Sequence, residues 1–136
     1  MEEDALKALF RDRQTTLLVS FEMVGNGSQL SESFSLDEPA SLYVLAAGEI
    51  STSGRYDYGW IERAESGERI WEMTINNTVH AGGKDQNRRI EGLIQLPAGE
   101  YIARYVSDYS HAFGDFGDEG PDDRTEWGMR IFRVVR

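Results

Sequence analysis

The pattern of apolar and polar residues along the chain changes near residue 15. In residues 2–13, apolar side chains recur at the spacing of one helix face, and acidic residues near the start suit the positive end of the helix dipole. The apolar positions of this segment are Ala5, Leu6, Leu9 and Phe10. The segment predicts a short helix, or a linker, that packs on the edge of the domain or continues a helix of a preceding domain.

From residue 15 onward the apolar residues follow a period of two, which is the period of a half-buried strand. In residues 15–24, for example, Val19 and Phe21 share one face, and Ser20 and Glu22 share the other. The segments with this strand character are 15–24, 32–36, 40–49, 56–64, 69–75, 88–96, 96–108 and 127–135. The third of these segments is apolar on both faces, which predicts a central strand covered on both sides.

Glycine, proline, asparagine and aspartate separate the strand segments, as in GNGS at 25–28 and in the hairpin predicted at Ser66-Gly67. Regularly spaced strands without helices between them argue against a parallel α/β fold and favour two packed antiparallel sheets. We therefore predict an all-β fold, an antiparallel β-sandwich of about eight strands in a jelly-roll-like arrangement. Residues 1–14 form the predicted helix or linker, and residues 15–136 form the sandwich domain.

Two stretches resemble a known family. FSLDEPASLYVLAAGE, residues 34–49, joins two strands through a proline turn, and LPAGEYIARYVSD, residues 96–108, starts a tyrosine-bearing strand with a Leu-Pro-Ala-Gly turn. Over residues 30–135 the chain resembles the bacterial pre-peptidase C-terminal type of accessory β-sandwich. The resemblance implies a non-catalytic, jelly-roll-like module appended to secreted enzymes or surface proteins, some of which bind calcium or polymeric substrates.

The resemblance also implies a protein partner or a neighbouring domain of the same chain, polysaccharide as a further ligand, and an extracellular or periplasmic location. The start of the chain, MEEDALKALF, is acidic where a secretory signal would be basic, so a cytosolic protein is the alternative. We favour an excised domain of a larger protein, because the chain stops at Arg136 directly after a strand-like segment, and the resemblance implies that this larger protein is exported.

Composition and charge narrow the possible partners. The chain has 136 residues, the size of one domain, and its 40% hydrophobic and 28% charged residues are typical of a soluble protein. The formal net charge is −10, of which residues 108–126 contribute −6 through seven acids and one base. Such concentrated acidity argues against nucleic-acid binding, which needs clustered Lys and Arg. No apolar run approaches the roughly 20 residues of a membrane span, and the absence of cysteine excludes disulfides and thiol catalysis.

Residues 107–128 combine most of this acidity with four glycines and four aromatic residues. Calcium binds about six to eight oxygen atoms from carboxylates, carbonyls and water, so Ca²⁺ is the ion that this segment predicts. Its candidate ligands are Asp108, Asp115, Asp118, Asp122 and Asp123. The spacing is not that of an EF-hand, and two alternatives stay open. One is a solvated loop whose acids cap turns, and the other is a loop held by ion pairs with Arg104, Arg130 or Arg133.

Catalytic chemistry has little support in the sequence. Ser107, Ser110, His111 and Asp108 suggest a triad, but residues so close in sequence rarely align as nucleophile, base and orienting group. His80 and His111 do not have the spacing of a zinc site. We predict that the chain is not an enzyme and that both histidines are structural or exposed. A hydrolase with His111 and a carboxylate in a cleft is kept as an alternative.

Three aromatic residues, Tyr56, Tyr58 and Trp60, share one face of the strand predicted at 56–64. If they are exposed they form a ligand-binding platform for sugar rings, and if they are buried they belong to the core. A carbohydrate-binding module is therefore one alternative to the accessory module. Another is a calcium-dependent, membrane-binding domain of the C2 kind, which requires Asp57 or Asp85 to converge with the acidic loop.

Overall fold

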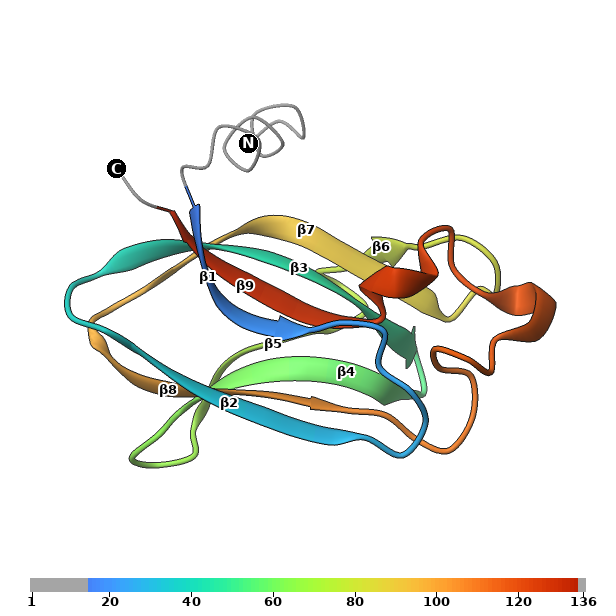
Figure 1. The fold of residues 1–136 in the computed structure, drawn as a ribbon, viewed down its shortest axis with the longest axis horizontal. Helices are drawn as coiled ribbons and strands as arrows, with labels where there is room; N and C mark the ends of the chain where they lie inside the picture. The colour runs from blue at the N-terminus through green and yellow to red at the C-terminus, as the bar shows by residue number, and fades with distance from the viewer. Residues whose placement is uncertain (1–14, 135–136) are drawn as a thin grey trace.

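The computed structural model of the chain describes residues 15–134, which form an all-β domain (Figure 1). The described residues contain no α-helix, only two short 3₁₀ turns among nine strands. The elements are β1 (Thr15–Phe21), β2 (Gln29–Leu36), β3 (Ala40–Ser51), β4 (Gly54–Arg63), β5 (Arg69–Glu72), β6 (Val79–His80), β7 (Asn87–Leu96), β8 (Gly99–Val106), η1 (Gly117–Glu119), η2 (Arg124–Glu126) and β9 (Gly128–Val134). The helix predicted at 2–13 lies outside the described residues.

Each strand predicted from the period-two pattern coincides with an observed strand, and only β6 was not predicted. β6 contains two residues, which is too short to show a period. β5 ends earlier than predicted because residues 74–77 turn: the Thr74 amide donates to Asn77 Oδ1, and the Asn77 amide donates to Thr74 Oγ1. The hairpin predicted at Ser66-Gly67 connects β4 and β5, and Gly67 has a positive φ of 75° there.

All strand pairs are antiparallel, and the strands form two layers (Figure 1). One layer has the order β6-β7-β3-β9-β1, and the other has the order β5-β4-β8-β2. The two layers are not separate sheets, because the end of β3 pairs with the start of β4, with Glu49 opposite Asp57. The sheet is therefore continuous and nearly closed, like a flattened barrel, which refines the predicted pair of packed sheets.

The core fills the space between the layers. Its fully buried members come from both layers and include Leu42, Val44, Ile61, Tyr105, Trp127 and Ile131. β3 is buried on both faces, as its sequence predicts. Its inner side chains join the core, whereas Tyr43 on the outer side forms a small second cluster with Phe132, flanked by Leu93 and Val134.

The loops 22–28, 81–87 and 107–127 meet at one end of the barrel, at the right in Figure 1, which we call the loop end. Backbone hydrogen bonds connect them: the Gly27 amide donates to the Asp108 carbonyl at 2.7 Å, and the Asp122 amide donates to the Ala81 carbonyl at 2.8 Å. The long acidic segment is therefore fixed to the rest of the barrel. No helix within residues 15–134 has the length and hydropathy of a membrane span.

Candidate functional site

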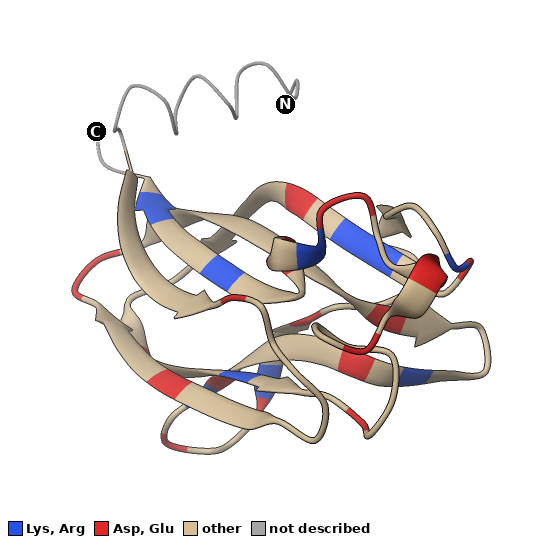
Figure 2. Cartoon of the chain, turned by 45° about the vertical axis from the view of Figure 1, so that its right-hand side comes forward, with Lys and Arg blue, Asp and Glu red and all other residues tan. Residues whose placement is uncertain are grey.

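Three carboxylates converge at the loop end, namely those of Glu49, Asp57 and Asp108. Glu49 lies near the end of β3, Asp57 lies opposite it on β4, and Asp108 follows β8. One oxygen atom of each lies within 4.8 Å of the other two, and this acidic triad could bind a metal ion. Glu49 and Asp57 are 4% and 0% exposed, and Asp108 is half-buried. Figure 2 shows acidic residues on several strands and loops at this end.

The alternation of β4 places Asp57 inside the barrel, on the same side as Gly59 and Ile61. The close approach of β3 and β4 depends on Gly48. A Cβ atom at that position would lie 2.0 Å from the carbonyl oxygen of Asp57, so any other residue would push the two strands apart. A register shift between Glu49 and Ile50 follows directly after this close contact.

Asp57 is bonded from two sides. Its Oδ1 accepts a hydrogen bond from the Asp108 amide at 2.9 Å, and its Oδ2 accepts one from the indole Nε1 of Trp127 at 2.9 Å. Burial is the main cause that raises the pKa of Asp57 to about 7; the Asp108 carboxylate adds to the rise, and the two hydrogen bonds oppose it. Near neutral pH this buried side chain therefore exchanges between a protonated and a charged form.

Lys84 supplies the positive charge closest to the triad. Its Nζ lies 2.9 Å from Glu49 Oε2, and this hydrogen bond is the main reason why the pKa of Lys84 is raised. Three ionised carboxylates and one ammonium group leave a local charge of −2. Uncompensated negative charge is costly in a buried site, and either a proton on Asp57 or a bound cation would reduce it.

His111 stands beside the triad as a packing and hydrogen-bonding residue. Its Nε2 lies 2.6 Å from Asn87 Oδ1, and Asn87 Nδ2 donates to the carbonyls of Gly82 and Glu119. Because the amide nitrogen of Asn87 is the donor in both bonds, Nε2 of His111 is the protonated nitrogen. The ring contacts Phe116 and Trp127 edge to face, and burial lowers its pKa. The backbone of His111 is left-handed, with φ of 58°, a conformation that histidine adopts more often than most residues.

Of the five predicted calcium ligands, only Asp108 belongs to the triad. Asp115 is exposed and accepts a hydrogen bond from Asn26, and Asp118 is exposed in η1. Asp123 caps η2 by accepting from Thr125, whereas Asp122 is exposed, with its carboxylate beside the backbone of Gly82. Within residues 15–134, the triad is the group of three acidic or histidine side chains close enough to share an ion.

The arginines proposed as partners of the acidic loop make other ion pairs. Arg104 pairs with Glu62, Arg130 with Glu22, and Arg133 with Asp37 and Glu38. A different arginine holds the loop: Arg89 of β7 donates to both carboxylate oxygens of Glu126, at 3.0 and 3.1 Å. This pair fixes η2 against the outer side of β7.

Sequence reasoning placed the five predicted calcium ligands within one loop; it named Asp57 only as a condition of the C2-like alternative, and it did not name Glu49. A signal for Asp57 was present, because its position in the alternation of β4 matches that of buried Ile61. An acid in the buried phase of a strand indicates a site or a buried network. For Glu49, the signal is weaker, since it ends a run of apolar residues where an exposed acid is common.

The predicted aromatic platform lies on the outer face of β4. Trp60 is 7% exposed and Tyr56 is 38% exposed. The guanidinium carbon of Arg69 lies 3.8 Å from the ring centre of Trp60, and that of Arg55 lies 4.6 Å from the ring centre of Tyr58. Two of the three rings therefore already have a cation over one face. A hollow of about 290 Å³ lies beside them, lined by Gln29, Leu30, Ser31, Trp60, Arg104 and Val106.

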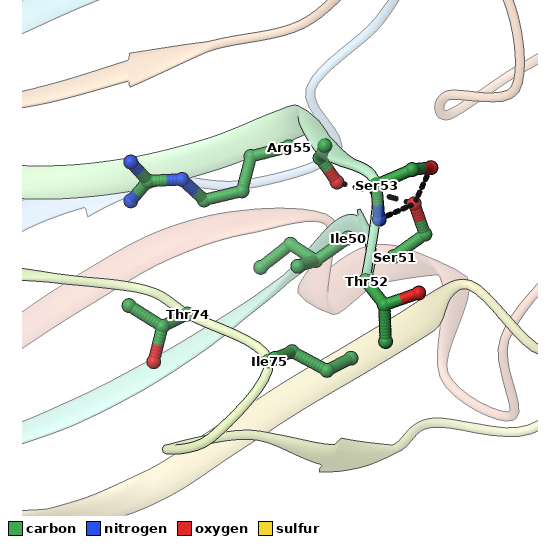
Figure 3. A pocket seen from close by; sticks show the side chains of 8 residues that line it. Ile50, Ser51, Thr52, Ser53, Arg55, Thr74 and Ile75 are labelled. Carbon is green, nitrogen blue, oxygen red and sulfur yellow. Dashed lines mark hydrogen bonds between the residues drawn. The ribbon is translucent and has the colours of Figure 1, made fainter.

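A second hollow of about 290 Å³ lies at the β3–β4 turn (Figure 3). It is lined by residues 50–55 with Thr74 and Ile75. The hydroxyl groups of Ser51 and Ser53 bond to each other at 2.9 Å. Arg55 extends away from the hollow (Figure 3), and its Nη1 bonds the Met73 carbonyl at 3.1 Å and pairs with Glu72. This hollow is lined by short hydroxyl side chains and isoleucines and contains none of the triad carboxylates.

The chain matches no protein-family model, no curated protein and no solved structure. The resemblance to the pre-peptidase C-terminal type of module therefore stays a prediction, and the function has to be argued from the site itself.

Proposed function

We propose that the chain is a non-catalytic β module that binds one divalent cation, with calcium favoured, at Glu49, Asp57 and Asp108. The observation that carries the proposal is the convergence of three carboxylates, two of them buried, opposite a single lysine. All three side chains offer oxygen ligands, which hard cations such as Ca²⁺ prefer. Backbone carbonyls and water would complete the coordination.

The role of the ion is to hold the loop end together. Glu49 and Asp57 belong to the barrel, whereas Asp108 begins the acidic loop. An ion shared by the three would connect the loop to the strands. We propose that the module supports or binds a neighbouring domain or protein partner within a larger, exported protein, as its resemblance to accessory modules implies.

We also infer that the strand arrangement is of the jelly-roll kind. Its support is the nested pairing of β1 with β9, β2 with β8, β3 with β7 and β4 with β5. Such nesting is what results when one long antiparallel hairpin is rolled into two layers. Jelly rolls present their loops at the two ends, and the proposed ion site lies at one of these ends.

Thermal unfolding with calcium and with chelator tests the cation site. At a calcium concentration about 100 times the dissociation constant, binding to the native state alone adds about 2.7 kcal/mol to the free energy of unfolding. For a domain of this size that is a rise in Tm of roughly 8–13 °C. We expect Asp108→Asn to abolish the rise and Asp118→Asn, an exposed control in the same loop, to keep it. Equal shifts in both variants, or no shift in the unmodified chain, would contradict the proposal.

A second candidate is calcium-dependent membrane binding of the C2 kind. It is favoured by the convergence of Asp57 with Asp108, the condition that this alternative requires. Large apolar side chains are also exposed in loops of the same end: Met23, Tyr109 and Phe113 are 50%, 88% and 36% exposed. Sedimentation with anionic vesicles, with and without calcium, separates this candidate from the accessory module. Binding to vesicles only with calcium would favour the membrane role.

A further inference from the structure

The outer face of the β5-β4-β8-β2 layer steps down from large to short side chains. Residues directly opposite one another on neighbouring antiparallel strands project to the same side of the sheet. Two such rows cross β4, β8 and β2, and they consist of Tyr58, Val106 and Gln29, and of Trp60, Arg104 and Ser31. Each row begins with an aromatic ring on β4 and ends with a shorter polar side chain on β2. The hollow of about 290 Å³ beside the rings lies at this step.

Arg104, which lines this hollow, is paired with a carboxylate. Its Nε donates to Glu62 Oε1 at 2.8 Å, and the indole Nε1 of Trp60 donates to the same oxygen at 2.9 Å. The bond from Trp60 is the main cause that lowers the pKa of Glu62, and the bond from Arg104 adds to it, so Glu62 is ionised at neutral pH. The side chain of Arg104 is 39% exposed and, within residues 15–134, bonds through Nε, which leaves its two terminal nitrogens as donors for a ligand.

The rest of the lining combines apolar surface with hydrogen-bonding groups. Leu30, Val106 and the ring of Trp60 supply the apolar part. The amide of Gln29 and the hydroxyl of Ser31 can each donate and accept, and both residues are exposed. A sugar ring has the complementary combination, because its C–H groups form apolar faces and its hydroxyl groups surround the edge. The volume lies at the lower end of the range for ligand pockets, about 300–1,000 Å³, and suits one unit of a longer chain.

The surroundings of the hollow favour a neutral sugar over an acidic one. The charges of Arg104 and Glu62 offset each other. Val106 lies two residues before Asp108, a member of the acidic triad, whose local charge with Lys84 is −2. A carboxylate or sulfate group on the ligand would therefore be repelled. The lining contains none of the triad carboxylates, so the hollow is a site separate from the proposed cation site.

We propose that the hollow binds one unit of a neutral polysaccharide, with Gln29, Ser31 and Arg104 bonding its hydroxyl groups. This site differs from the aromatic platform predicted from the sequence. Arg69 covers one face of Trp60, and a second arginine covers one face of Tyr58, so the sugar contacts the part of the Trp60 ring that borders the hollow. The module would then hold a polymer on the outer face of one layer and the cation at the loop end.

Amide NMR titration of the full chain tests this proposal. The probes are cellohexaose, mannohexaose and xylohexaose at millimolar concentration, with an oligogalacturonate as the acidic comparison. Titration in the presence of a chelator makes the result independent of the cation proposal. We expect at least one neutral probe to shift the indole signal of Trp60 and the amide signals of Ser31 and Arg104. The amide signal of Ser35, which lies on the same face of β2 outside the lining, should stay unchanged.

Two variants assign the binding to the hollow. Gln29→Ala combined with Ser31→Ala should weaken it about tenfold or more, because hydrogen bonds to the sugar are lost. Ser35→Ala, a matched substitution at an exposed position of the same strand, should preserve it. All three positions are exposed, so the fold should tolerate each change. Absence of binding to every neutral probe, tighter binding of the oligogalacturonate, or equal affinities in the two variants would overturn the proposal.

Discussion

The buried carboxyl group of Asp57 predicts an unusual dependence of stability on pH in the metal-free protein. Its pKa is about 7 in the folded state and close to the ordinary value of 3.8 in the unfolded chain. Above about pH 4, the unfolded chain releases a proton that the folded protein retains. The free energy of unfolding therefore falls as pH rises from about 4 to about 7, and it levels off at higher pH.

The size of the effect follows from the two pKa values. Between about pH 5 and pH 8.5 the folded carboxyl loses its proton while the unfolded one is already charged, which lowers the free energy of unfolding by about 3 kcal/mol. His111 acts in the opposite direction, because burial lowers its pKa and the unfolded chain binds its proton first as pH falls through about 6.5. The contribution of Asp57 must therefore be measured against a variant that lacks only this carboxyl.

The assay is urea unfolding in the presence of a chelator, at both pH values, for the unmodified chain and for Asp57→Asn. Asparagine stays neutral, so the variant should lose the fall of about 3 kcal/mol, which corresponds to roughly 1 M or more in the urea midpoint. Asparagine will also lower the free energy of unfolding at both pH values. The Asp108 amide and the Trp127 indole each donate to one oxygen of Asp57, and asparagine has an oxygen for only one of these two donors. If the free energy of unfolding of Asp57→Asn falls between the two pH values as much as that of the unmodified chain, the assignment of this titration to Asp57 is refuted.

Two further substitutions test how the site is built. Gly48→Ala should lower the free energy of unfolding by about 3 kcal/mol or more, because the new Cβ would lie 2.0 Å from the Asp57 carbonyl, whereas Gly92→Ala on β7 meets no atom within 4 Å and should change it little. Equal urea midpoints for the two variants would contradict this. Lys84→Met should cost about 1–3 kcal/mol, since it leaves the carboxylate of Glu49 buried without its cation. In a double-mutant cycle, Lys84→Met should cost much less when Glu49→Gln is already present. If the effects of the two substitutions on the free energy of unfolding simply add, Lys84 and Glu49 do not interact.

The strands could be predicted from the sequence because each carries its own signal. The alternation around Val19 and Phe21 in β1, and the apolar run of β3, fix which segments are extended and which faces are buried. The closure of the sheet could not be predicted in this way. It depends on how far β3 runs past its pairing with β9 to pair with β4, and on the small volume of Gly48, neither of which leaves a periodic signal.

The site was harder to predict than the fold for a related reason. Asp115, Asp118 and Asp123 lie close in sequence to Asp108, yet they face solvent or cap turns, because a loop with several glycines can turn each carboxylate in a different direction. Convergence instead comes from strand register, which sets Glu49 opposite Asp57. Acid content alone identifies the loop end, but only the pairing of β3 with β4 identifies the triad.

Isothermal titration calorimetry with calcium is the most direct test of the central claim, which is that the acidic triad holds an ion. Titrated into chelator-treated protein above pH 7, calcium should bind with a stoichiometry of about one ion per chain. Asp57→Asn and Asp108→Asn should each abolish this binding, and Asp118→Asn should preserve it. Absence of calcium binding to the unmodified chain, or binding that is lost only in Asp118→Asn, would contradict the account.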